Sequence, residues 1–335
     1  MSAIITIVII LVALVTLLFS FTLVKLATGN ARVQKELARL PSEKMPYIGE
    51  VDRLEVLPLV DYYASDEGLR TEPGVSYLVR AGDKNILLDL GLNAKKEHPS
   101  PLLHNMQALD VDPQSLDMIF ISHPHLDHLG GMAEQKSGTF SVSQGPVDLP
   151  GIPVYAPAPL EAGPHNPRPN VEVITRPTKL AEGVASMGVI PRNLYLAGYT
   201  PEQALVVNVR GKGLVIIIGC GHQTIERILE QAERLFDEPV HAVIGGLHFP
   251  VHGGRIKVGP LDMQAIVGAD RPPWNSVNEK DVASGLAALT RADPRLVALS
   301  PHDSSDWAID RFKEVFPDRY RDIRVGDPIV VEAEA

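Results

Sequence analysis

The stretch Ser122-His123-Pro124-His125-Leu126-Asp127-His128-Leu129-Gly130-Gly131 decides the fold. It places three imidazoles and one carboxylate directly after a short apolar run. Because side chains alternate along an extended segment, His123 and His125 point the same way, and a turn lets Asp127 and His128 face the same space. Histidine and carboxylate ligands suit zinc, iron or manganese, and an open coordination position holds a reactive water. The alternative is a set of surface histidines on a turn, but the spacing after a buried strand favours a metal site.

The pattern His-x-His-x-Asp-His followed by glycines resembles the signature of the metallo-β-lactamase superfamily. Residues 74–79 (GVSYLV) and 87–91 (LLDLG) look like the opening strands of that family, and the resemblance runs from about residue 53 to the C-terminus. It implies an α+β fold, a four-layered αβ/βα sandwich with metal ions at one edge of two facing sheets.

A second motif, Gly219-Cys220-Gly221-His222, follows the apolar run 214–218. It resembles the Gly-Cys-Ser-His element of one branch, the 7,8-dihydropterin-6-methyl-4-(β-D-ribofuranosyl)aminobenzene-5'-phosphate synthase-like proteins. Most of the superfamily carries a bridging aspartate where Cys220 stands. We expect Cys220 to pack beside the metals, with thiolate ligation as the alternative. We expect His222 to bind metal; a histidine bonded to backbone at a helix start is the alternative.

Two further histidines end apolar runs: His248 in Gly245-Gly246-Leu247-His248, and His302 in Ser300-Pro301-His302-Asp303. His248 is expected to handle protons or a substrate oxyanion, with metal ligation as the alternative. The resemblance makes His302 a metal ligand. Asp303 either orients a ligand imidazole or faces solvent. The branch usually has His-Cys-Thr-Gly where this chain has residues 302–305 (HDSS), which leaves the substrate open.

The sequence therefore predicts a metal-dependent hydrolase that uses a metal-bound hydroxide on an ester, lactone or phosphoester. A bound ion lowers the pKa of water from about 15.7 to about 7. The expected cofactor is Zn²⁺, one or two ions, with iron or manganese as alternatives. One ion is expected on His123, His125 and His222, and a second on Asp127, His128 and His302, while Asp127 or His248 exchanges protons as the catalytic group.

Two other functions stay open: a pterin-related transferase or synthase of the same branch, and a non-catalytic, membrane-tethered metal-binding scaffold. The expected partner is a small-molecule substrate. A net charge of −10 argues against nucleic acid as a partner. The single cysteine allows no intrachain disulfide. The oligomeric state is not predicted.

Residues 1–24 are expected to form a transmembrane anchor. The run from Ser2 to Val24 is uncharged and long enough to cross a bilayer. A cleaved signal peptide is the alternative, but the apolar run is longer than usual and no basic residue precedes it. Five basic residues follow it, which places the catalytic domain in the cytoplasm as a single-pass membrane protein. Residues 25–50 are interpreted as a juxtamembrane linker, and residues 51–335 as the catalytic domain.

The rest of the soluble chain alternates short apolar runs with amphipathic segments. Residues 144–170 hold eight prolines and are expected to form an irregular loop outside the core. Trp274 lies in a proline-rich loop after His248, where it forms part of a lid or simply packs. Strands are expected at 53–63, 75–80, 85–90, 118–122, 204–209, 214–218, 242–244 and 296–299, and helices at 101–109, 225–236, 281–292 and 307–316.

Overall fold

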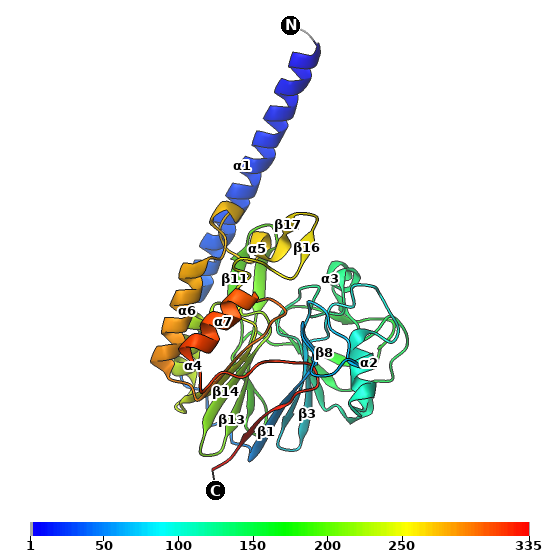
Figure 1. Cartoon of the computed structure of the whole chain (residues 1–335), viewed down its shortest axis with the longest axis vertical. Helices are drawn as coiled ribbons and strands as arrows, with labels where there is room; N and C mark the ends of the chain where they lie inside the picture. Colours follow the sequence, from blue (N-terminus) through cyan, green and yellow to red (C-terminus); the bar gives the residue numbers. More distant parts are fainter. Residues whose placement is uncertain (1–2, 335) are drawn as a thin grey trace.

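Two mixed β-sheets face each other in the computed structural model, which describes residues 3–334 (Figure 1). The first sheet has seven strands in the order β19-β1-β2-β3-β4-β6-β8, and the second has six in the order β18-β15-β14-β13-β10-β9. The first consists of β1 (Arg53–Val60), β2 (Ser76–Ala81), β3 (Lys84–Leu88), β4 (Met118–Phe120), β6 (Pro153–Ala156), β8 (Asn170–Val173) and β19 (Ile329–Glu332). The second consists of β9 (Thr178–Ala181), β10 (Val184–Ser186), β13 (Leu205–Val209), β14 (Gly213–Ile218), β15 (Val240–Gly245) and β18 (Leu296–Leu299).

Helices and short hairpins complete the chain. The helices are α1 (Ala3–Leu37), α2 (Pro101–Ala108), α3 (Met132–Ser137), α4 (Ile225–Leu235), α5 (Met263–Val267), α6 (Glu279–Ala292) and α7 (Asp306–Val315), with 3-10 turns η1 (Pro113–Ser115) and η2 (Pro273–Asn275). Three two-stranded pairs stand apart from the main sheets: β11 (Ile190–Leu194) with β12 (Gly198–Glu202), β16 (Lys257–Val258) with β17 (Leu261–Asp262), and β5 (Thr139–Phe140) with β7 (Glu161–Ala162).

Three apolar cores separate four layers. One fills the space between the sheets, where Val79 of the first sheet and Ile217 of the second are both fully buried. Another joins the second sheet to α4, α6 and α7, and includes Ile228 and Phe312. The third lies between α2 and the outer face of the first sheet. Each sheet thus buries both faces, one against the other sheet and one against helices, which is the predicted αβ/βα sandwich.

Local sequence signals set the ends of the covering helices. Helix α6 begins with a capping box, in which the Asn278 side chain accepts backbone N–H groups and Asp281 bonds back to the backbone of Asn278. Helix α2 begins at a serine cap, where the Ser100 hydroxyl accepts the N–H of Leu103 and Pro101 takes the first helical position. These caps set the residues at which the two helices begin.

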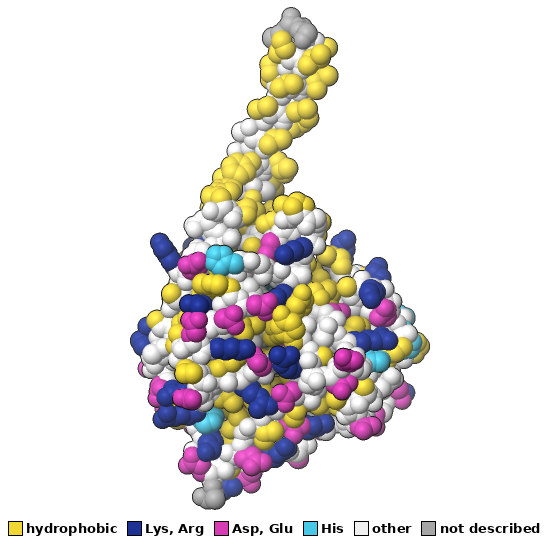
Figure 2. Space-filling model, in the orientation of Figure 1, with side chains coloured by type: hydrophobic (Ala, Val, Ile, Leu, Met, Phe, Trp, Pro, Cys, Tyr) yellow, Lys and Arg dark blue, Asp and Glu magenta, His cyan; other side chains and the backbone are white. Residues whose placement is uncertain are grey.

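Helix α1 projects from the domain as a long apolar rod, visible in Figures 1 and 2. Its most apolar window has a mean hydropathy of 3.1 and is not buried against the domain. The helix is long and apolar enough to cross a membrane by length and composition. It does not end at Val24, however: it continues to Leu37, and Leu26 and Val33 are buried against the domain. Residues 25–37 are therefore a docked helical segment.

Most of the expected elements are present with boundaries shifted by one to three residues. The expectation for residues 144–170 is wrong in part: β6 lies inside the first sheet between β4 and β8, and Val154 and Ala156 are fully buried. Pro153 is tolerated because it stands at the first position of its strand.

Candidate metal centre

Four loops meet at one edge of the sandwich because the strands before them end in register. In the second sheet Ile218 pairs with Gly245 and Gly245 with Leu299, all in parallel strands. In the first sheet Phe120 pairs in parallel with Leu88. The loops after β4, β14, β15 and β18 therefore open toward the same space and carry all the histidines that the sequence singled out.

A first donor group consists of His123, His125 and His222. One donor atom from each lies within 4.8 Å of the others. The Nε2 of His123 is 3.0 Å from the Nδ1 of His125, too close for two lone pairs unless a proton or a cation lies between them. Among residues 3–334, neither ring nitrogen of His222 has a hydrogen-bond partner, although the side chain is buried. Buried polar groups are nearly always hydrogen-bonded, so a buried imidazole without a partner fits the role of a metal ligand.

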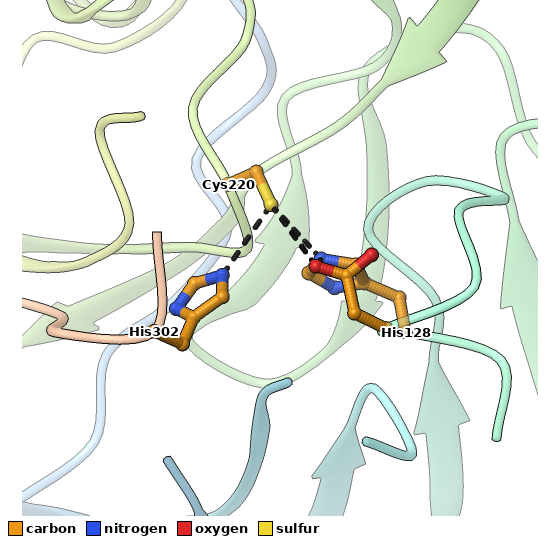
Figure 3. Close-up of side chains that lie close together, drawn as sticks. His128, Cys220 and His302 are labelled. Atoms are coloured by element: carbon orange, nitrogen blue, oxygen red, sulfur yellow. Dashed lines mark hydrogen bonds and ion pairs between the residues drawn. The ribbon is translucent and has the colours of Figure 1, made fainter. Parts of the chain in front are cut away.

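A second donor group consists of Asp127, His128, Cys220 and His302, all buried and within the same 4.8 Å limit (Figure 3). The Sγ of Cys220 is 3.0 Å from the Nε2 of His128 and 3.3 Å from the Nε2 of His302. It lies 4.0 Å from the Oδ2 of Asp127. Cys220, His222 and His248 form a third such group, so the thiol lies between both halves of the centre.

A buried serine and aspartate orient the first loop. The Ser122 hydroxyl donates to the Oδ2 of Asp89 at 2.6 Å and lies 3.0 Å from the Nδ1 of His123. The same Asp89 oxygen is 2.7 Å from the Nδ1 of His128. His123 and His128 therefore each have their Nδ1 in contact with Ser122 or Asp89, and their Nε2 points toward the other donor groups. Protein metal sites orient histidine ligands by such contacts.

His302 is fixed by a separate chain of hydrogen bonds. The Ser300 hydroxyl is 2.6 Å from the Nδ1 of His302 and 2.6 Å from the Oδ2 of Asp61. The Tyr77 hydroxyl also donates to Asp61, at 2.9 Å. Asp303 does not face solvent: it is fully buried, its Oδ2 lies 3.9 Å from the Nε2 of His302, and the same oxygen accepts the backbone N–H of His248 at 2.9 Å. It thus positions the loop that carries His248.

Glu202 holds the Cys220–His222 loop in place. Its carboxylate accepts the backbone N–H of Gly221 at 2.7 Å and that of His222 at 2.8 Å. Gly221 adopts a φ of +68°, and a Cβ there would lie 2.5 Å from the Gly246 carbonyl oxygen. Only glycine fits this crossing of the β14 and β15 loops.

His248 stands beside the first donor group under a covering segment. Its ring centroid is 4.4 Å from that of His222, its Nε2 is 3.1 Å from the carbonyl oxygen of Gln264, and its Nδ1 has no partner among residues 3–334. Its φ is +52°, an uncommon conformation for a non-glycine residue. The Gln264 amide in turn donates to the carbonyl oxygen of His302 at 2.8 Å, so α5 closes over the centre.

Burial sets the protonation of most of these groups. It lowers the pKa of His125 to about 4 and that of His302 to about 3, and it also lowers the pKa of His123 and His222. These imidazoles are therefore neutral at pH 7 and can offer lone pairs to a cation.

The Asp127–His128 pair behaves differently. Burial alone would lower the pKa of His128, but the carboxylates of Asp127 and Asp89 outweigh it and raise that pKa to about 10. Burial raises the pKa of Asp127, yet the surrounding histidines, His128 first, hold it below its usual range. A proton on His128 thus occupies a position that a bound cation would take.

The structure brings together all six residues predicted as metal ligands, with His248 beside them. Sequence reasoning missed the residues that orient them: Asp61, Asp89, Ser122, Glu202, Gln264 and Ser300. A usable signal existed for two of these, since Asp61 and Asp89 are lone carboxylates at the ends of apolar runs. Buried carboxylates rarely occur without a partner.

The model of the metallo-β-lactamase superfamily matches residues 69–139. The chain is 28% identical over 238 residues to 7,8-dihydropterin-6-methyl-4-(β-D-ribofuranosyl)aminobenzene-5'-phosphate synthase of Methanocaldococcus jannaschii, an alignment that covers 60% of this chain and 79% of the relative. A crystal structure described as a metal-dependent hydrolase of the β-lactamase superfamily aligns with a TM-score of 0.56 at 21% identity, over 83% of this chain and 99% of the other. The metallo-β-lactamase fold protein YhfI of Bacillus subtilis aligns with a TM-score of 0.52 at 15% identity, over 84% and 100%.

The chain shares the fold of the metallo-β-lactamase superfamily, a class whose fold holds divalent metal ions and whose members are generally enzymes, and part of its sequence matches the model of that superfamily. Within this class, the chain is similar in sequence to the pterin-related synthase, as the Gly-Cys-Gly-His and Gly-Gly-Leu-His motifs suggested.

Proposed function

We propose that the protein is a membrane-anchored, metal-dependent hydrolase of an ester, lactone or phosphoester. The observation that carries the proposal is the pair of buried donor groups at one sheet edge, with Cys220 between them. Together they offer more ligands than the four that close a purely structural zinc site, so an open position for water remains.

The residues fit one or two ions of the zinc type. His123, His125 and His222 would hold one, and their neutral imidazoles and the unpaired nitrogens of His222 support this. Asp127, His128, His302 and Cys220 would hold the other. We replace our expectation of a merely packing thiol with ligation, because Cys220 lies at hydrogen-bond distance from two imidazole nitrogens. Bound ions would supply Lewis-acid chemistry and a water of lowered pKa.

The chain's own groups would then position the reactants and move protons. Asp127 stays a carboxylate, since the neighbouring histidines hold its pKa low, and it can accept a proton from the attacking water. His248 is neutral, because burial lowers its pKa, and its unpaired Nδ1 can hydrogen-bond an oxygen that gains charge. Helix α5 covers the centre and limits the access of bulk water.

A second candidate is a synthase reaction related to that of the pterin relative. The observation that favours it is the 28% identity over 238 residues. Residues 302–305 depart from the pattern of that branch, which speaks against an identical substrate.

A metal count followed by hydrolysis assays tests these functions against the metal-binding scaffold. The full-length protein, purified in detergent, would be assayed for zinc, iron and manganese by elemental analysis, with the His123→Ala/His125→Ala double variant as control. We expect close to two ions in the wild type and a loss in the control. Hydrolysis of p-nitrophenyl acetate and bis(p-nitrophenyl) phosphate would follow. A folded protein that takes up no metal contradicts the enzyme proposal. Metal without hydrolysis contradicts the hydrolase proposal and is the result expected of the synthase or of the metal-binding scaffold.

The proposal includes membrane anchoring by α1, with the domain on the cytoplasmic side. Support comes from the uncharged apolar run before Lys25 and from the basic residues that follow it. The orientation can be tested in sealed spheroplasts of an expressing bacterium. A single cysteine introduced on the surface of the domain is exposed to a membrane-impermeant thiol reagent, which does not reach the cytoplasmic side. Cys220 is buried and would not react.

A further inference from the structure

We infer that residues 254–277, the segment that covers the metal centre, form a membrane-contacting surface, and that the substrate is an amphiphile taken from the bilayer. This inference rests on the proposed anchoring and hydrolase function. The segment comprises β16, β17, α5 and η2, and it lies at the end of the domain from which α1 projects (Figure 1).

The first observation is a contact that fixes the position of this segment along helix α1. The ring of Trp274 in η2 lies 5.7 Å, centroid to centroid, from the ring of Phe19 in α1. Phe19 belongs to the uncharged run and precedes Lys25 by six residues, or about 9 Å along a helix axis. If α1 spans the bilayer and Lys25 marks its edge, this contact places the Trp274 ring within about 9 Å of that edge, on the hydrocarbon side. Tryptophan is enriched near the membrane–water interfaces of membrane proteins.

The second observation is the exposure of large apolar side chains on the same segment. Trp274 is 66% exposed, Val258 62% and Leu261 53%. Val258 and Leu261 pair across the tip of the β16–β17 hairpin. Exposed Lys257 stands beside them and suits an anionic headgroup layer. Apolar tips with an adjacent cation, at the level of a membrane boundary, fit the bilayer in which α1 is anchored rather than a separate protein.

The third observation links this surface to the metal centre over a short distance. Asn30 of α1 donates to the backbone carbonyl of Asp270 at 2.8 Å. The Asp270 carboxylate pairs with Arg192 at 3.0 Å, and Arg192 donates to the carbonyl oxygen of His222. Asn30 lies only five residues beyond Lys25, about 8 Å along the helix. This chain of contacts ties the loop of His222 to a part of α1 that lies about 8 Å beyond Lys25.

The covering segment contacts both the apolar part of α1 and the histidines of the donor groups. Gln264 contacts His248 and His302, and a Cβ at Gly268 would lie 1.8 Å from the Nε2 of His248. Substrate reaching the centre past this segment would come from the side that carries Val258, Leu261 and Trp274. An amphiphile with its ester in the headgroup layer meets that geometry. Its hydrolysis consumes one water and yields an acid and an alcohol.

Brominated lipids test the surface without any assay of activity. The chain has two tryptophans, Trp274 and Trp307 on α7. Full-length Trp307→Phe and Trp274→Phe would be placed in nanodiscs of phosphatidylcholine and phosphatidylglycerol, with or without brominated phosphatidylcholine. We expect bromine to quench Trp274 at least twofold in Trp307→Phe and to leave Trp307 nearly unchanged in Trp274→Phe. Equal, weak quenching of both would overturn the membrane surface.

A second arm tests the substrate class. The Val258→Asp/Leu261→Asp variant alters exposed side chains only, so hydrolysis of soluble p-nitrophenyl acetate should stay unchanged. Hydrolysis of p-nitrophenyl palmitate dissolved in the nanodisc should fall about tenfold. Equal rates on the palmitate ester would overturn the amphiphile assignment. If neither ester is hydrolysed by the metal-loaded wild type while Trp274 is quenched, the ester-hydrolase proposal fails and the membrane surface stands.

Discussion

Cys220 distinguishes this metal centre at the scale of single residues. The sequence resemblance implies a bridging aspartate at this position in most of the superfamily, whereas here a buried thiol lies within 3.3 Å of nitrogens from His128 and His302. Burial, followed by the nearby Asp127, raises the pKa of the free thiol, so it stays protonated until a cation displaces the proton. Thiolate ligation selects softer metals such as zinc over magnesium.

Replacing Cys220 by alanine should therefore change the metal spectrum and not only the activity. The cobalt-loaded wild type should show a near-ultraviolet thiolate-to-cobalt absorption band, and Cys220→Ala should lack it and bind one ion fewer. The measurement is absorption spectroscopy with elemental analysis on the same sample, with the zinc-loaded protein as the colourless control. An unchanged band and metal count in Cys220→Ala would return the thiol to a packing role.

His302 should make the metal-free protein sensitive to acid. Its pKa is lowered to about 3 by burial, so the unfolded chain binds a proton near pH 6.5 that the folded protein does not. The stability that His302 contributes is complete above pH 6.5 and is lost as the pH falls. The free-energy difference between wild type and His302→Gln should thus shrink by about 1.4 kcal/mol from about pH 7.5 to about pH 5.5. Urea unfolding of both metal-free proteins measures it; a pH-independent difference contradicts the neutral, buried imidazole.

At the scale of elements, the strand ends decide where the ligands meet, and tight backbone crossings keep them there. Gly219 follows β14 directly, and a Cβ added to it would lie 2.2 Å from the Ser122 hydroxyl and 3.0 Å from Asp89. Those two side chains fix one nitrogen of His123 and of His128. The loops after β4 and β14 are therefore coupled through a space that only a glycine leaves open.

Gly219→Ala should weaken metal binding without removing any ligand. The added methyl displaces the Ser122–Asp89 pair, and loss of such an orienting contact typically lowers metal affinity about 10- to 100-fold. Competition with a chromophoric chelator measures the affinity. Gly151→Ala is the matched control, because its nearest neighbour would be 3.9 Å away. Equal affinities in the two variants would show that the pair does not orient the histidines.

The same scale explains which features were predictable from sequence. Strands such as β14 and the histidines after them carry local signals, namely a continuous apolar run and a ligand motif. The burial of β6 carried none, because eight prolines in residues 144–170 resemble a loop, and only pairing with β4 and β8 makes that segment a strand. Asp61 and Ser300 are 239 residues apart, so their support of His302 depends on long-range contacts.

At the scale of the whole molecule, α1 serves as both apolar rod and structural part of the domain. Its first two thirds are exposed, while its last turns pack on β11 and β12. The Tyr199 hydroxyl donates to Glu36 at 2.6 Å, and the Asn193 amide donates to Asn30 at 2.8 Å. A Cβ at Gly29 would lie 2.2 Å from the Asn193 side chain, which indicates a close helix-to-hairpin approach. The boundary between the exposed apolar part and the docked part therefore lies within one continuous helix.

Two deletions should separate the exposed apolar part of α1 from the part that is docked on the domain. Removing residues 2–24 takes away mostly exposed apolar surface, together with the Phe19–Trp274 contact, so the remaining domain should nearly keep its melting temperature and need less detergent. Removing residues 2–40 exposes the surface that Leu26 and Val33 bury, together with the partners of Asn30 and Glu36. Burial of two such side chains contributes about 3–6 kcal/mol, which corresponds to a fall in Tm of about 10 °C in a domain of this size. Differential scanning calorimetry compares the two, and equal melting temperatures would mean that the docked turns of α1 add nothing to the stability of the domain.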